Sequence, residues 1–192
     1  MADTQVTADT LTLEEFIRRY DQQPFELING EIRRLVPTMS GHNRMTSALM
    51  WALLSYVKPQ NLGEVYAEAP FVLTYESNWV KGLCVPDLMF IAAERLAAYR
   101  ASDPDADRKP FTLVPDLVVE IISPNDKYSE VDEKVEAYLQ DSVRLVWVVD
   151  LQRKKIAVHA PNTPQVWLAG DDKLTGGDVI PGFEIAVAGL FE

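Results

Sequence analysis

One acidic residue and one lysine stand out as the residues whose types and surroundings could do chemistry. Glu120 lies inside an apolar run, residues 113–122, which is too short for a helix and is interpreted as a strand covered on both faces. A carboxylate in such a strand costs several kcal/mol unless a cation, a metal or donated hydrogen bonds compensate it. Lys134 falls within the apolar stripe of the next predicted helix, residues 128–140. A buried carboxylate and an inward lysine, joined by a short loop, indicate parts of one site.

A second acid extends this candidate site. Asp87 follows Pro86 in another apolar run, residues 84–91, which also reads as a strand. If the two strands are neighbours, Asp87 and Glu120 can converge on a hard cation, and oxygen-only ligation suits Mg²⁺ or Mn²⁺. A zinc site would need Cys and His clusters, whereas the chain has one Cys and two His. Lys134 could then orient an attacking water beside a phosphate and offset developing charge.

Each of the three residues also has a plain structural interpretation. Asp87 could cap a strand end, and Glu120 could form a structural ion pair with a basic residue. Lys134 could form a surface salt bridge with Glu130, four residues earlier on the helix. Its position among apolar neighbours favours an inward direction instead.

Three further residues are expected to have no role in chemistry. Asp116 shares strand parity with Glu120 and is interpreted as the polar entry to the strand rather than as a supporting group. His42, near a predicted helix start, is interpreted as exposed or capping. Cys84, the single cysteine, is expected to be a small buried apolar residue.

Length, composition and charge limit the classes of function. The 192 residues are expected to form a single domain, 1–192, with residues 1–9 as a disordered tail. No signal peptide or apolar segment of ~20 residues is present, and one cysteine forms no internal disulfide, so we expect a cytoplasmic protein without membrane contact. The net charge of −11 argues against affinity that comes mainly from phosphate neutralisation.

Periodicity and turn signals predict an α/β protein. Asn29-Gly30 between two alternating segments predicts a hairpin, because both turn positions need positive φ. The other predicted elements are helices at about 12–20, 40–57, 92–100 and 128–140, and strands at about 64–74, 84–91, 113–122, 144–150 and 155–160, followed by short antiparallel strands. Hairpins and crossovers together indicate a mixed central β-sheet flanked by helices, three-layered in its centre, with extra antiparallel hairpin strands.

With these residues in place, the chain resembles the PD-(D/E)XK nuclease superfamily, and more closely the bacterial Uma-type family, whose members are named as putative restriction endonucleases. The resemblance runs through nearly the whole sequence, in the order FELINGEI, GHNRMTSAL, VPDLMFI, PDLVVEIISPNDKYSEVDEKVEAYL, VRLVWVVD and PGFEI. It implies a restriction-endonuclease-like core, a divalent metal and phosphodiester hydrolysis.

Carried over residue by residue, the resemblance implies that Asp87 and Glu120 bind metal and that Lys134 is the catalytic lysine. The Ile121 carbonyl is a further candidate ligand, and Glu26 or Glu31, on the hairpin, match acidic positions often placed beside such a site. The chain departs from the parent pattern at one point. The lysine is expected two residues after the acid, where this chain has Ile122, so Lys134 has to reach back from the helix.

The leading hypothesis is therefore a Mg²⁺-dependent (or Mn²⁺-dependent) endonuclease that acts on DNA, and a homodimer because two cuts need two sites. The alternative is a catalytically inactive nucleic-acid-associated or protein-interaction domain that retains the nuclease fold, which the acidic balance favours. A third hypothesis, hydrolysis of a smaller phosphate compound, would tolerate the acidic surface but has no specific support. Metal binding that is lost in Glu120→Gln would separate the first hypothesis from the second.

Overall fold

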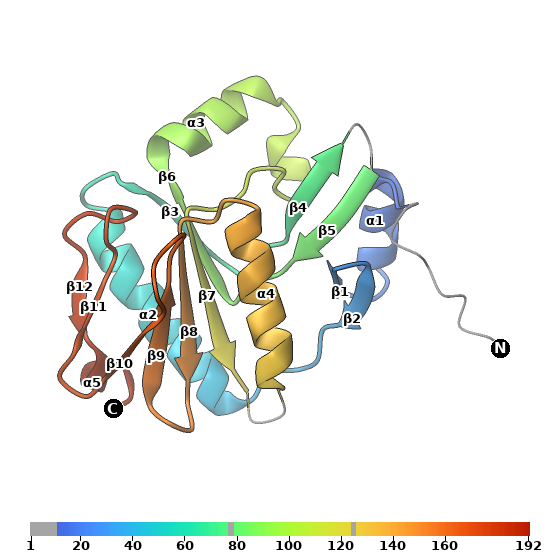
Figure 1. Ribbon diagram of the computed structural model, residues 1–192. Coiled ribbons are helices and arrows are strands. Elements are labelled where there is room, and N and C mark those ends of the chain that lie inside the picture. Colours follow the sequence, from blue (N-terminus) through green and yellow to red (C-terminus); the bar gives the residue numbers. More distant parts are fainter. Residues whose placement is uncertain (1–10, 77–78, 124–125) are drawn as a thin grey trace.

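The computed structural model describes residues 11–76, 79–123 and 126–192, so the tail predicted at residues 1–9 lies outside the described residues (Figure 1). None of the helices in these three ranges combines the length and apolar character needed to cross a bilayer. The helices are α1 (Leu13–Tyr20), α2 (Ser40–Val57), α3 (Ala93–Ser102), the 3₁₀ helix η2 (Ala106–Arg108), α4 (Tyr128–Gln140) and α5 (Val187–Leu190). The strands are β1 (Phe25–Ile28), β2 (Glu31–Arg34), β3 (Gly63–Ala67), β4 (Phe71–Glu76), β5 (Trp79–Cys84), β6 (Leu88–Ala92), β7 (Leu117–Ile122), β8 (Leu145–Asp150), β9 (Lys155–His159), β10 (Val166–Ala169), β11 (Lys173–Thr175) and β12 (Glu184–Ala186).

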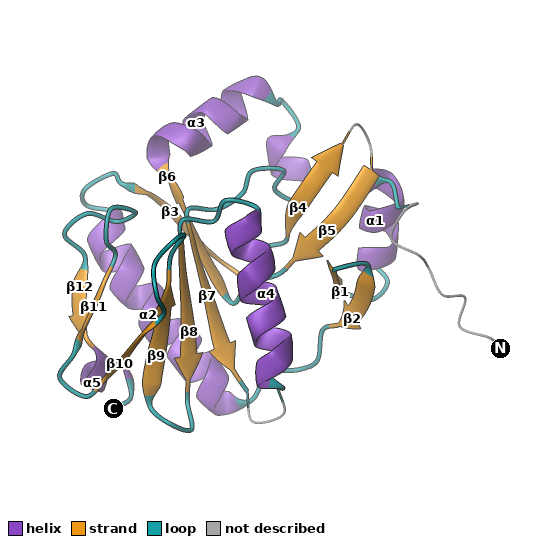
Figure 2. Cartoon of the chain, in the orientation of Figure 1, coloured by secondary structure: helices purple, strands orange, loops and turns teal. Residues whose placement is uncertain are grey.

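The central sheet is mixed, as the sequence predicts. Its strand order is β10-β9-β8-β7-β6-β3, and β7 and β8 run parallel while the other neighbouring pairs run antiparallel. The β7–β8 crossover is α4, which lies alongside the sheet in Figure 2. The predicted α/β class is therefore confirmed.

Helices cover both faces of this sheet because both faces of β7 are apolar. Leu117, Val119 and Ile121 pack with residues of α2, which places that helix on one face. Val118 and Ile122, which alternate with them, pack with residues of α4 and α3 on the other face. Glu120 has the parity of Val118 and Ile122, so its side chain belongs to the face covered by α4.

A second, antiparallel sheet with order β2-β1-β5-β4 lies beside the central one (Figure 1). The hairpin β1–β2 turns at Asn29 and Gly30, with φ of 50° and 80°, which confirms the turn prediction. The helix α1 begins after Thr12, whose hydroxyl oxygen accepts the Glu15 N–H at 3.2 Å, as a capping residue does. Within this sheet β1 pairs with both β2 and β5.

Two predicted strands are wrong because prolines and turns divide them. The predicted strand 64–74 is β3 and β4, which belong to different sheets; Glu68 has φ 50° and Pro70 follows it. The predicted strand 84–91 is interrupted at Pro86, since proline has no N–H to donate to a ladder. As a result, Asp87 lies in the connection between β5 and β6 rather than inside a covered strand.

Candidate active site

A pocket of about 680 Å³ lies at the end of β7, where the starts of α2 and α4 meet the connection between β5 and β6. Leu35, Val36 and Met39, all exposed, form an apolar part of its rim. The ionisable residues that line the pocket are Glu26, Arg33, Arg34, His42, Asp87, Glu120, Asp126, Glu130 and Lys134. Four of the five residues predicted as catalytic therefore share one pocket.

Strand pairing brings Asp87 to Glu120. In the antiparallel β6–β7 ladder Leu88 is opposite Val119, so the next residues along, Asp87 and Glu120, meet at the end of the ladder. The Ile121 N–H donates a hydrogen bond to Asp87 Oδ2 at 2.6 Å. The condition on which the predicted acidic pair depends, that the two strands are neighbours, is confirmed.

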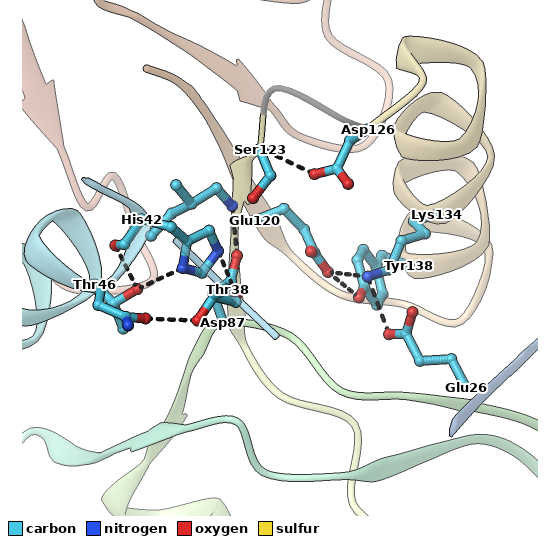
Figure 3. A network of polar contacts seen from close by, with 12 residues as sticks. Glu26, Thr38, His42, Thr46, Asp87, Glu120, Ser123, Asp126, Lys134 and Tyr138 are labelled. Carbon is cyan, nitrogen blue, oxygen red and sulfur yellow. Dashed lines mark hydrogen bonds and ion pairs between the residues drawn. The ribbon is translucent and has the colours of Figure 1, made fainter. Parts of the chain in front are cut away.

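Lys134 points inward from α4 and joins two acids. Its Nζ lies 2.9 Å from Glu120 Oε1 and 3.0 Å from Glu26 Oε1, and its side chain is 13% exposed (Figure 3). The alternative salt bridge with Glu130 is wrong, because Glu130 Oε1 forms an exposed ion pair with Lys127 Nζ at 2.8 Å. Lys134 therefore extends from α4 over the end of β7. A lysine on this helix has to do so, because the position where the superfamily has its lysine is Ile122 in this chain.

The buried carboxylate of Glu120 is stabilised by a hydrogen-bond donor as well as by the charge of Lys134. In Figure 3 its side chain extends from β7 towards α4, where the Tyr138 hydroxyl donates to Oε1 at 2.5 Å. Tyr138 is fully buried and stacks on Phe71. Helical periodicity places Tyr138 on the apolar stripe of residues 128–140 and predicts only packing for it. Its proximity to Lys134, one helical turn away, is the signal that could have suggested a polar role.

The electrostatics of the pocket are those of an acidic cluster with too few cations. Burial, together with the negative charges of Asp87 and Glu26, raises the pKa of Glu120 to about 7, although the charge of Lys134 and the Tyr138 hydrogen bond act in the opposite direction. Burial alone would lower the pKa of Lys134, but the charges of Glu120 and Glu26 outweigh it, so that pKa is raised and the amine stays protonated.

The two hairpin acids have different positions. Glu26 is buried, and its Oε1 accepts the Val85 N–H at 2.9 Å in addition to the contact with Lys134. Glu31 is not brought to the pocket, and its side chain is 77% exposed. Glu31 directly follows the Asn29-Gly30 turn and pairs with Ile28, so it lies at the far end of the hairpin from Glu26. The prediction of Glu31 as a site residue is corrected accordingly.

The prediction that His42 is exposed or capping is also wrong. His42 is 4% exposed, lines the pocket, and has its Nε2 3.0 Å from Asp87 Oδ1. Asp116, by contrast, is the polar entry to its strand, as predicted. It is fully buried outside the pocket lining, where Oδ2 accepts the Ala92 N–H at 2.9 Å and Oδ1 lies 2.9 Å from Arg95 Nη1. Cys84 is buried, as expected.

The donor set of the pocket fits a hard divalent cation bound through few protein ligands. Across residues 11–76, 79–123 and 126–192 no group of three or more His, Cys, Asp or Glu side chains has the arrangement of a metal-binding cluster. Mg²⁺, however, typically takes one or two carboxylates and keeps several waters. Asp87 and Glu120 line the pocket with Ile121, so two carboxylates and a backbone carbonyl would be the oxygen ligands of such a cation.

The fold and the pocket together define a restriction-endonuclease-like α/β protein. The chain belongs to the Uma2 family, described as "Putative restriction endonuclease", which matches residues 13–188. A solved structure, that of "a putative nuclease belonging to DUF820" from Anabaena variabilis ATCC 29413, superimposes with a TM-score of 0.78 at 20% sequence identity, over 95% of this chain and 98% of that chain. No curated protein matches the sequence. Membership of this family supports nuclease function, that is, hydrolysis of nucleic acids.

Proposed function

We propose that this protein is a Mg²⁺- or Mn²⁺-dependent endonuclease that hydrolyses phosphodiester bonds of DNA. The observation that carries the proposal is the position of the Lys134 amine, held between Glu120 and Glu26 in the pocket that Asp87 also lines. A lysine that only stabilised the fold would not need to lie at a pocket that the carboxylates of Asp87, Asp126 and Glu130 also line. The family description agrees with this chemistry.

Each residue has a role in the proposed reaction. Asp87 and Glu120, with the Ile121 carbonyl, would hold the cation, which when bound would supply a Lewis acid to the phosphate. Lys134 orients the attacking water and stabilises the charge that develops on the phosphoryl oxygens. The water oxygen bonds to phosphorus and gives up one proton to solvent as one ester P–O bond breaks, and the departing oxygen takes up one proton from solvent. Glu26 accepts from the Lys134 ammonium and so fixes its direction.

The alternative is a domain that keeps the nuclease fold without activity and associates with nucleic acid or protein. The net charge of −11 favours it, because nucleic-acid binding gains most of its affinity from neutralised phosphates. Of the two arginines that line the pocket, Arg33 is paired with Glu133. Metal binding separates the two functions, since the inactive domain has no need to bind Mn²⁺.

The test compares wild-type protein with Asp87→Ala, Glu120→Gln and Lys134→Ala on linear, supercoiled and single-stranded DNA in Mn²⁺ or Mg²⁺. We expect cleavage of at least one DNA form by the wild type and none by the three variants. Glu31→Gln and Lys127→Ala are the matched controls, an acid and a lysine outside the pocket lining, and should cleave like the wild type. Equal cleavage by all six proteins would indicate a contaminating nuclease and would refute the assignment.

A homodimer and a cytoplasmic location complete the proposal. Double-strand cleavage needs two active sites, and a symmetric dimer is the commonest way for a protein to supply them. Analytical ultracentrifugation of the wild-type protein with and without Mn²⁺ would measure the oligomeric state.

A further inference from the structure

His42 is a buried polar residue of the pocket to which the proposed reaction gives no role. It lies in the first turn of α2, on the opposite side of Asp87 from the Glu120–Lys134 pair (Figure 3). Its Nε2 lies 3.0 Å from Asp87 Oδ1, and the imidazole is 4% exposed. A carboxylate is only an acceptor, so the nitrogen that faces it carries the hydrogen and donates.

Asp87 needs restraint because of its place in the fold. It belongs to the connection between β5 and β6, after Pro86, and so has no partner in a strand ladder. Two donors fix its carboxylate, the Ile121 N–H on Oδ2 at 2.6 Å and His42 on Oδ1 at 3.0 Å. The Ile121 N–H belongs to β7 of the central sheet, and His42 belongs to α2, which packs on one face of that sheet. Two layers of the protein therefore fix the Asp87 side chain.

The other side of the imidazole is restrained as well. The Thr46 hydroxyl donates to the His42 carbonyl oxygen at 3.1 Å, which places Oγ1 3.5 Å from Nδ1. Thr46 is one turn further along α2, so the helix itself presents this oxygen to the ring. His42 therefore has one direction open for a strong hydrogen bond, and that direction leads to Asp87.

We propose that His42 is a positioning residue that holds Asp87 in the orientation needed to bind the divalent cation. The inference rests on the proposed function. Both carboxylate oxygens keep a lone pair beyond the one engaged by a donor, and the Asp87 side chain is still 15% exposed. Outer hydrogen-bond partners of metal ligands typically contribute 10–100-fold to metal affinity.

The test measures Mn²⁺ affinity of the full-length protein by calorimetry in wild type, His42→Gln and His42→Asn. A glutamine amide nitrogen reaches about as far as Nε2, whereas an asparagine amide nitrogen reaches only as far as Nδ1. We expect Mn²⁺ to bind His42→Asn about 10–100-fold more weakly than wild type, and His42→Gln to recover most of that loss. His159→Phe, which removes the chain's other histidine from β9, should bind Mn²⁺ like the wild type.

Kinetics give a second readout that a purely structural role would not move. The Mn²⁺ concentration for half-maximal cleavage should rise in His42→Asn by the same factor as the dissociation constant, while the rate at saturating Mn²⁺ changes much less. Equal Mn²⁺ affinity in wild type, His42→Asn and His42→Gln would overturn this inference alone. A wild-type protein that binds no Mn²⁺ would overturn the proposed function and this inference with it.

Discussion

Replacement of Lys134 by methionine tests the central contact of the site through stability rather than activity. Methionine keeps most of the volume and the apolar stem but removes the charge. Glu26 and Glu120, whose side chains are 7% and 12% exposed, would then face each other without the amine that lies 3.0 and 2.9 Å from them. Removal of one partner from a buried ion pair costs about 3–5 kcal/mol, and we expect a loss of that size at about pH 8.

The pH dependence of this loss in the free energy of unfolding follows from the pKa of the Glu120 carboxyl group. The pKa of Glu120 is raised to about 7 in the wild type, and Lys134 is a factor that lowers it, so the variant should have a still higher pKa. An acid whose pKa is raised on folding contributes stability at low pH that is lost as pH rises through the folded-state pKa. The deficit of Lys134→Met relative to wild type should therefore shrink as pH falls from the variant's higher Glu120 pKa to about 7, by up to about 1.4 kcal/mol per pH unit, and stay constant at lower pH, where Glu120 is protonated in both proteins.

The assay is urea unfolding of wild type and variant at about pH 6 and about pH 8, which bracket the Glu120 pKa. Lys127→Met is the control, because Lys127 precedes the same helix but forms an exposed pair with Glu130 and should leave the free energy of unfolding nearly unchanged at both pH values. If Lys134→Met were as stable as Lys127→Met at about pH 8, the amine would not be compensating two buried acids, and the geometry of the site would be wrong.

Other predictions concern the same acid and the packing around it. The proposed Mn²⁺ site uses ionised Glu120 as a ligand, so affinity measured by calorimetry should rise with pH up to about 7 and level off above it; a flat profile would exclude Glu120 as a ligand. Tyr138→Phe removes a hydrogen bond that lowers the Glu120 pKa, so the midpoint of that profile should move to higher pH, and an unchanged midpoint would count against the contact. Gly63→Ala should destabilise the protein in urea by about 1–3 kcal/mol, because its Cβ would lie 2.1 Å from the Ile91 carbonyl oxygen; Gly41→Ala, with nothing within 4 Å, should cause no such loss.

Local features of the chain could be predicted because their causes are local. The Asn29-Gly30 hairpin depends on two residues that adopt positive φ, and α4 has the same bounds, Tyr128–Gln140, as the predicted helix. The inward direction of Lys134 also follows from its place in the apolar stripe. The breaks between β3 and β4, at Glu68–Pro70, and between β5 and β6, at Pro86, were not predicted. At each break the chain passes from one sheet to the other, and which sheet a strand joins depends on partners distant in sequence rather than on the apolar run itself.

By itself, the sequence determined most of the helices, the mixed α/β class and the three residues Asp87, Glu120 and Lys134 as one candidate group. Only the tertiary structure decided which partners surround them. It selected Glu26 over Glu31, turned His42 onto Asp87 and placed the Tyr138 hydroxyl on Glu120. The physical reason is that these contacts join separate layers of the fold, and the spacing of residues along one segment carries no information about which side chain of another segment will face it.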